Sequence, residues 1–301
     1  MNFAQLLFPD FSLILAGFLV CRFTPLGRNV WEPVESLVYY LLFPVLLFQS
    51  IVKSPLDVRE ASSLMAAGLA LSACGMLMAY SLPHLPLLGR SIAKRDHAGA
   101  AQIAFRFNSF IALAIASRLA GDRGSQLIAV LIGVCVPFIN VGAVWPMARH
   151  GQGGMVKALL TNPLIIATIS GLAFNMAGLH VLVWLEPTLT RIGAASIALG
   201  LMTAGAGLQF GSLAVNKTLT VGLLAIRHFM MPLAAFVLAR VFRLDDVQTA
   251  ILLAFSAMPT ASSAYVLAVR MGYNGPYVAG LVTLSTILGL ASLPFALGVL
   301  R

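Results

Sequence analysis

The chain has 301 residues, of which 59% are hydrophobic and only 10% are charged, and its mean hydropathy is +0.93. A soluble domain of this length needs many more charged side chains on its surface, so the composition excludes one and indicates an integral membrane protein. The net charge of +9 lies mostly between apolar segments, where Lys and Arg set the topology and contact anionic lipids, and there is no basic–aromatic patch for nucleic acid.

Ten apolar segments follow one another along the chain, each close to the roughly 20 residues that a membrane span needs. They lie at 5–22, 34–52, 61–82, 98–119, 125–148, 157–178, 190–210, 218–240, 247–269 and 276–300. The first segment has no basic region before it and no cleavage site after it, so we expect a retained span. No loop is long enough for a soluble domain, and the function is therefore expected in or across the lipid bilayer.

The ten segments predict two repeats of five. The matched positions are Pro9 with Pro163, Gly17 with Gly171, Gln49 with Gln209, Asp96 with Asp246, and Phe105 with Phe255. Because each half would have an odd number of spans, the halves would cross the membrane in opposite orientations, which is typical of secondary transporters. We therefore expect an all-α fold with one repeat at 1–153, the other at 154–301, and a site near the midplane.

The fourth segment contains "FRFNSFIALAIA" (105–116), which places a cation, Arg106, and an amide, Asn108, in an otherwise apolar helix. A buried cation is costly unless it meets water or a partner, so Arg106 is a candidate for binding an anion. Asn108 and the neighbouring Ser109 are further site candidates. The alternatives are a packing hydrogen bond for Asn108 and, for Arg106, a backbone carbonyl partner or a snorkelling side chain.

The ninth segment contains "AFSAMPTASSAYVLAVRMGYNG" (254–275), in which Pro259 removes a backbone donor and interrupts the helix. Hydroxyl groups that can satisfy freed backbone groups or contact a ligand surround this proline. They belong to Ser256, Thr260, Ser262 and Ser263. With a slip of one residue, the repeat sets Asn108 against Pro259. Two broken helices that cross there would present two helix N-termini, which favour an anion such as a carboxylate; a proline kink without any site is the alternative.

Other polar residues of the segments are weaker candidates. Gln49 and Gln209 gain weight as site residues because they occupy equivalent positions in the two repeats. Asn140 is a single amide of a kind that is more typical of helix packing, and we keep it as a site candidate. Arg227 and His228, in the eighth segment, carry no motif and are interpreted as structural.

The acidic residues and the cysteines bear on ions and cofactors. All ten Asp and Glu residues lie at segment ends or in loops, which argues against obvious cation exchange and fits an anion site. Coupling to H⁺ or Na⁺ through hydroxyls, amides, carbonyls or His228 stays open. Cys21, Cys74 and Cys135 lie in different segments, with no CxxC pair and no His at ligand spacing, so we expect no disulfide, metal or other cofactor.

Four stretches resemble the auxin efflux carrier family over essentially the whole chain: "YYLLFPVLLFQSI" (39–51), "FRFNSFIALAIA", "KALLTNPLIIATISGLAF" (157–174) and "MPTASSAYVLAVRMGYNG". The resemblance implies two inverted five-helix repeats, similar to the bile-acid:sodium symporter architecture. Helices 1, 2, 6 and 7 would form a scaffold, and helices 3–5 and 8–10 a transport domain in which broken helices four and nine cross at Asn108 and Pro259. The sequence departs from plant members of the family, which have prolines around that asparagine where Arg106 and Phe107 stand here.

The resemblance implies a secondary transporter or facilitator that moves an organic carboxylate by alternating access. Bacterial members are associated with malate, malonate and related carboxylates, and plant members export auxin. The protein would lie in the cell membrane with both termini outside, and a homodimer through the scaffold helices is left open. The alternative is a Na⁺- or H⁺-coupled organic-anion symporter. A passive channel would show no trans-stimulation, and a membrane-embedded enzyme is disfavoured because the spans contain no Ser–His, paired-Asp or Asp-rich constellation.

Overall fold

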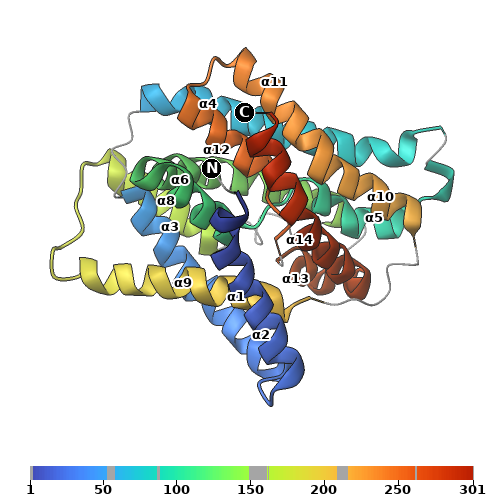
Figure 1. Ribbon diagram of the computed structural model, residues 1–301, viewed down its shortest axis with the longest axis horizontal. Helices are drawn as coiled ribbons and strands as arrows, with labels where there is room; N and C mark the ends of the chain where they lie inside the picture. Colours follow the sequence, from blue (N-terminus) through green and yellow to red (C-terminus); the bar gives the residue numbers. More distant parts are fainter. Residues whose placement is uncertain are drawn as a thin grey trace.

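The computed structural model describes residues 3–52, 58–86, 89–148, 161, 163–208, 216–261 and 263–300. Throughout these ranges the regular structure is helical, and no strand occurs in them (Figure 1). The α-helices are α1 (Phe3–Phe23), α2 (Arg28–Leu37), α3 (Phe43–Val52), α4 (Val58–Ser81), α5 (Lys94–Ala100), α6 (Ser109–Ala148), α8 (Pro163–Met176), α9 (Glu186–Ala206), α10 (Lys217–Ala225), α11 (Met231–Val241), α12 (Asp246–Ala257), α13 (Ser263–Arg270) and α14 (Gly275–Gly298). Short turns of other helical types are η1 (Val38–Leu42), η2 (Leu82–His84), η3 (Gly89–Ser91), η4 (Ala101–Ala104) and η6 (Ile226–Met230).

Within the described residues, five continuous helical stretches are long and apolar enough to cross a membrane. They are Arg28–Gln49, Ser62–His84, Ile111–Met147, Lys217–Val241 and Gly275–Gly298. These stretches support the expectation of an all-helical, membrane-embedded protein. The count of ten crossings and the inverted relation of the halves stay predictions, and the proposed boundary between the repeats at 153–154 lies outside the described residues.

Small residues let α1 and α9 approach each other closely. A Cβ atom added to Gly17 would collide with the backbone of Met202, and one added to Gly205 would collide with the backbone of Ile14. Glycines at such crossings bring helix backbones into van der Waals contact, which is the usual packing solution where lipid supplies no hydrophobic driving force. The helix α9 also packs on α3, which in turn packs on α8 (Figure 1).

The long helix α6 contains a sharp break between the expected fourth and fifth segments. Ala120 has φ −147° and ψ 23°, and Gly121 has φ 57° and ψ −138°. These are not helical values, so α6 consists of two helical parts joined by a kink at these residues. The positive φ of Gly121 lies in the region that favours glycine, which explains why the chain turns at this residue.

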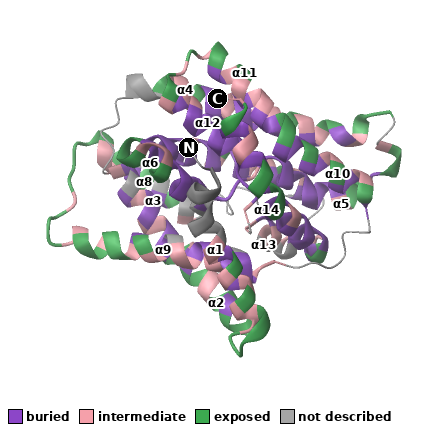
Figure 2. Cartoon of the chain, in the orientation of Figure 1, coloured by how far each residue is buried: buried purple, intermediate pink, exposed green. Residues whose placement is uncertain are grey.

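Burial is greatest on the helices that surround the site described below. From Ala250 to Ala257 every side chain of α12 is buried, as are most side chains in the central part of α14 and on the inner face of α6 (Figure 2). Large apolar side chains on the outer faces remain exposed, as expected where a membrane protein faces lipid. Examples are Leu19, Ile169, Val221, Val237 and Val241.

Candidate functional site

Two helix breaks lie against each other near the centre of the fold. The chain is not helical at 105–108, between η4 and α6, and again at 258–261, between α12 and α13. The backbone N–H of Asn108 donates to the carbonyl of Pro259 at 2.7 Å, and the Thr260 hydroxyl donates to the Ile103 carbonyl at 2.7 Å. The breaks fall where Asn108 and Pro259 were predicted to interrupt their helices, and these two hydrogen bonds join them.

Local chemistry accounts for both breaks. Asn108 precedes the first residue of α6, and its side-chain Oδ1 accepts a hydrogen bond from the N–H of Ile111 at 3.2 Å, as an N-cap does. Pro259 has no N–H to donate, so α12 cannot continue through it. A Cβ atom at Gly289 of α14 would lie 2.5 Å from Cγ of Pro259, which shows how closely α14 packs on the proline ring.

Arg106 lies beside this crossing and is held by two amides. Its Nη1 donates to Oε1 of Gln102 at 3.0 Å, and its Nη2 donates to Oδ1 of Asn140 at 3.1 Å. No carboxylate of the described ranges pairs with Arg106. The guanidinium is therefore hydrogen-bonded but not neutralised by a described carboxylate, so its positive charge attracts an anion placed next to it.

Among the described residues, the Oδ1 of Asn140 has a hydrogen-bond partner and its Nδ2 has none. The side chain is only 5% exposed, and its Oδ1 faces the guanidinium of Arg106. This contact fixes the orientation of the amide, because a guanidinium can only donate. The Nδ2 group has no hydrogen-bond partner among the described residues. A buried N–H₂ without an acceptor is costly, so it marks a position where an acceptor fits.

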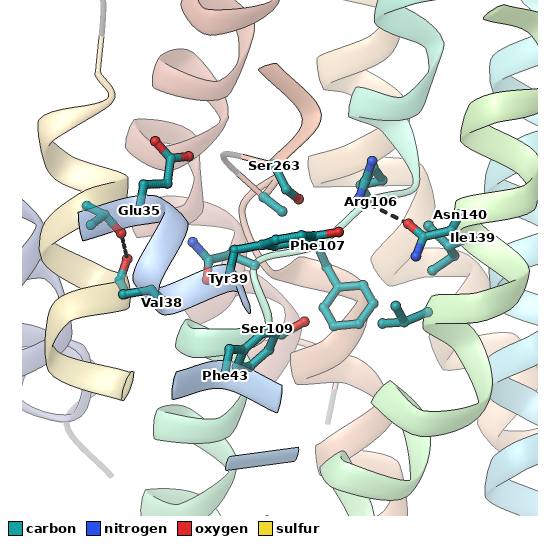
Figure 3. A pocket seen from close by; sticks show the side chains of 15 residues that line it. Glu35, Val38, Tyr39, Phe43, Arg106, Phe107, Ser109, Ile139, Asn140 and Ser263 are labelled. Atoms are coloured by element: carbon teal, nitrogen blue, oxygen red, sulfur yellow. Dashed lines mark hydrogen bonds between the residues drawn. The ribbon is translucent and has the colours of Figure 1, made fainter. Parts of the chain in front are cut away.

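A cavity of about 90 Å³ lies against these groups. One water needs about 10–15 Å³ on this scale, so the cavity has room for several waters or for a small organic ion. Its polar lining comes from Glu35, Tyr39, Arg106, Asn108, Ser109, Asn140, Thr203 and Ser263, and its apolar lining from Val38, Phe43, Phe107, Val136, Ile139, Gly200 and Ala261. Figure 3 shows Arg106 and Asn140 joined on one side of the cavity and Glu35 on the opposite side.

The predicted site residues divide into those that line the cavity and those that do not. Arg106, Asn108, Ser109, Asn140 and Ser263 line it. Pro259 and Thr260 lie just behind it and hold the crossing together through their hydrogen bonds. Gln209 and Ser262 lie outside the described residues.

Gln49 has a packing contact and is not part of the cavity lining. It is 6% exposed, and its Nε2 donates to the hydroxyl of Thr190 at 2.7 Å, which links α3 to α9. Asn175 makes a similar link, because its Nδ2 donates to the Ile51 carbonyl at 2.8 Å. Both hydrogen bonds link helices that pack against each other.

Sequence reasoning missed Glu35, Tyr39 and Thr203 as lining residues. Glu35 stands at a segment end, as all acidic residues do, yet it faces the cavity, and its Oε2 lies 3.6 Å from Nη2 of Arg28. The available signal was its spacing: Glu35 and Tyr39 are four residues apart and therefore share one helix face. The cysteines are free, and the described residues contain no group of His, Cys, Asp and Glu that could hold a metal ion.

The fold and the site together define a class: a helical membrane protein with an internal cavity where two interrupted helices meet. A family described as "membrane transport protein" matches residues 147–297, half of the chain, and the protein belongs to this family. A protein of Methanothermobacter thermautotrophicus, described as an uncharacterized transporter, is 24% identical over 288 residues, which cover 94% of this chain and 93% of that relative. The family and the relative indicate a transporter.

Proposed function

We propose that the protein is a secondary transporter of a small organic carboxylate, and that the carboxylate binds in the cavity beside Arg106 and Asn140. The observation that carries the proposal is the free Nδ2 group of Asn140, buried next to a guanidinium that no described carboxylate neutralises. A carboxylate supplies both the missing acceptor and the missing negative charge.

Two helix N-termini add to the positive potential of this site. Ser109 begins α6 and Ser263 begins α13, and both residues line the cavity. The first N–H groups of a helix have no partner within the helix, and its N-terminus carries a partial positive charge, so each end favours an anion. The apolar lining, which includes Phe43 and Phe107, suits the carbon skeleton of an organic acid better than it suits an inorganic anion.

The position of the cavity between two groups of helices supports alternating access. One wall comes from η1, α3 and α9, which supply Val38, Tyr39, Phe43, Gly200 and Thr203. The opposite wall comes from the two breaks and from α6 and α13, which supply Arg106, Asn108, Ser109, Asn140 and Ser263. In the proposed mechanism the first group, with α1 and α8, is the scaffold, and the second group moves against it and exposes the anion to either side in turn.

The finer assignments belong to the same proposal. We infer ten spans in two inverted repeats, a place in the cell membrane with both termini outside, and kinship with carboxylate-transporting members of the auxin efflux carrier family. The motifs at 105–116 and 254–275 support this inference, because both contain a helix break that meets the other. Coupling of the anion to H⁺ or Na⁺ is the alternative form of the same function.

Transport by purified protein in liposomes tests the proposal. A panel of radiolabelled mono- and dicarboxylates is offered with and without imposed proton and sodium gradients, and uptake and counterflow are recorded. We expect saturable uptake of at least one carboxylate and stimulation by the same acid on the far side. Non-saturable flux without trans-stimulation would indicate a channel, and movement of an organic cation but no carboxylate would refute the anion site.

A further inference from the structure

A second polar cluster lies against the end of α12, and its residues are not among those that line the cavity. Its centre is Arg227, which is carried by the π-helical turn η6 and is only 1% exposed. The guanidinium contacts the C-terminal end of α12: Nε donates to the carbonyl of Met258 at 2.6 Å, and Nη2 donates to the carbonyl of Phe255 at 3.2 Å. No carboxylate of the described residues pairs with it.

The end of α12 is a place where a cation is expected. The last carbonyls of a helix lack partners within the helix and carry a partial negative charge, so they attract positive groups and can act as oxygen ligands for ions. Arg227 supplies that positive charge from within the chain. Because its fork of N–H groups spans two carbonyls at once, it holds the orientation of the helix end as well as its charge.

The same cluster fixes the residues on both sides of Pro259. Arg227 holds the Met258 carbonyl before the proline, and the Ser285 hydroxyl accepts a hydrogen bond from the N–H of Thr260 after it, at 2.9 Å. His228 supports this arrangement, because its Nε2 lies 2.8 Å from the same Ser285 oxygen. These hydrogen bonds fix the peptide groups on both sides of Pro259, and they thereby fix the Pro259 carbonyl that the N–H of Asn108 contacts.

His228 also reaches the end of α12 through α14. Its Nδ1 lies 2.9 Å from the hydroxyl of Ser292, which donates to the carbonyl of Ala257 at 3.0 Å. Side chains of η6 and α14 thus satisfy the carbonyls of Phe255, Ala257 and Met258 together. This leaves the terminus of α12 without an open carbonyl among these three positions.

We propose that Arg227 is a built-in cation that positions the crossing and makes it independent of a bound metal cation. Arg227 is a positioning residue, since it acts on the anion site through Pro259 and Asn108, and its effect on transport rests on the function proposed above. Two consequences follow. Transport by the wild-type protein proceeds at the same rate in sodium and in choline salts, and removal of the Arg227 side chain leaves a carbonyl-lined space that accepts a free guanidinium ion.

Chemical rescue tests the cation site without any knowledge of the substrate. The unfolding temperature of the purified full chain is measured in detergent while millimolar guanidinium or urea is added, because urea has nearly the same shape without the charge. Arg227→Ala is expected to unfold at a lower temperature than the wild type, and guanidinium, but not urea, is expected to raise that temperature saturably, as a ligand of the folded state does. The wild type and Arg240→Ala, which removes an exposed arginine of α11, should respond alike to both additives. Equal responses of Arg227→Ala to guanidinium and urea would overturn the site.

A second pair of variants covers the case in which Arg227→Ala does not fold. Arg227→Met keeps the length without the charge, and Arg227→Lys keeps the charge without the fork. We expect Lys to restore folding that Met loses, and the KM of the Lys variant for the transported carboxylate to rise about tenfold or more, because the crossing is less well placed. A Met variant that equals the wild type in unfolding temperature and transport refutes the need for a cation, and a Lys variant with wild-type KM refutes the positioning role. Rescue by guanidinium in a protein that moves no carboxylate would leave the cation site standing and defeat the proposed function instead.

Discussion

The N–H of Asn108 donates to the carbonyl of Pro259 at 2.7 Å, across 151 positions of sequence. This bond connects the non-helical stretch before α6 to the one after α12, so that each break satisfies a backbone group that the other leaves open. Inside a membrane, backbone N–H and C=O groups have no water to bind, so they form hydrogen bonds within the protein or remain unpaired. The crossing is therefore a structural unit, and the cavity lies against it.

Asn108 caps α6 as well as contributing to the cavity, and its substitutions separate these roles. Asn108→Ala loses the bond to the Ile111 N–H and is expected to destabilise the protein by about 1 kcal/mol and to abolish carboxylate transport. Asn108→Ser keeps a capping oxygen and should recover most of the stability. Thermal unfolding and uptake in liposomes provide the two readouts. Wild-type transport by Asn108→Ala would mean that the anion does not bind at this crossing.

Asn140 tests the electrostatic part of the proposal. Asn140→Asp places a carboxylate against Arg106, which should form a charge-assisted pair, preserve or raise the unfolding temperature, and cancel the charge that attracts the anion. Asn140→Leu removes both halves of the amide and leaves Arg106 short of one acceptor, so it should lower stability as well as transport. The expected signature is a stable Asp variant that has lost saturable binding of carboxylate. If that variant binds carboxylate as tightly as the wild type, the anion lies elsewhere.

Gln49 offers the opposite case, a buried polar residue outside the cavity. Gln49→Leu removes the bond to Thr190 and should cost about 1 kcal/mol of the free energy of unfolding. Because neither residue lines the cavity, the KM for carboxylate should not change. Thr190→Val is the matched control, since it removes the same hydrogen bond from the other side and should give a similar loss. A raised KM in Gln49→Leu but not in Thr190→Val would return Gln49 to the binding site.

The close crossing of α1 and α9 predicts a strong steric effect. Gly17→Val forces a side chain into the backbone of Met202, and overpacking of this kind costs about 1–3 kcal/mol where the neighbour cannot move. Leu15→Ala, on the exposed face of the same helix, should change the unfolding temperature little. The comparison requires only purified protein and a thermal unfolding curve. Equal stability of Gly17→Val and the wild type would show that the two helices can separate at this point.

Local signals made several features predictable. The composition indicates a membrane protein, and Pro259 cannot continue a helix, so the break in the ninth segment was predictable from the residue itself. The break at Asn108 was predicted from the repeat alignment with Pro259 and from the family resemblance. Arg106 was predicted to have a binding partner, because a cation in an apolar segment is costly without one. The inferences about Pro259 and Arg106 depend on a residue and its immediate neighbours.

Other features depend on how the helices face one another. The position of a polar residue within an apolar segment indicates how deep in the membrane the residue lies. Because such a segment is apolar on nearly all faces, it does not indicate which neighbouring helix the residue faces. Gln49 and Asn140 were similar candidates by type, and the fold turned one toward Thr190 and the other toward Arg106. Glu35 lies at a segment end and was not predicted to be a site residue, but it lines the cavity.

By itself, then, the sequence determined a chain of apolar helices with two interruptions and with two arginines, Arg106 and Arg227, inside apolar segments. The tertiary structure decided which partners those groups have. Arg106 donates to two amides, Arg227 donates to carbonyls at the end of α12, and the Nδ2 of Asn140 has no partner among the described residues. The physical reason is that the role of a buried polar group depends on the few groups that lie within hydrogen-bond distance of it. In this fold those groups come from helices far apart in the chain, and only packing brings them together.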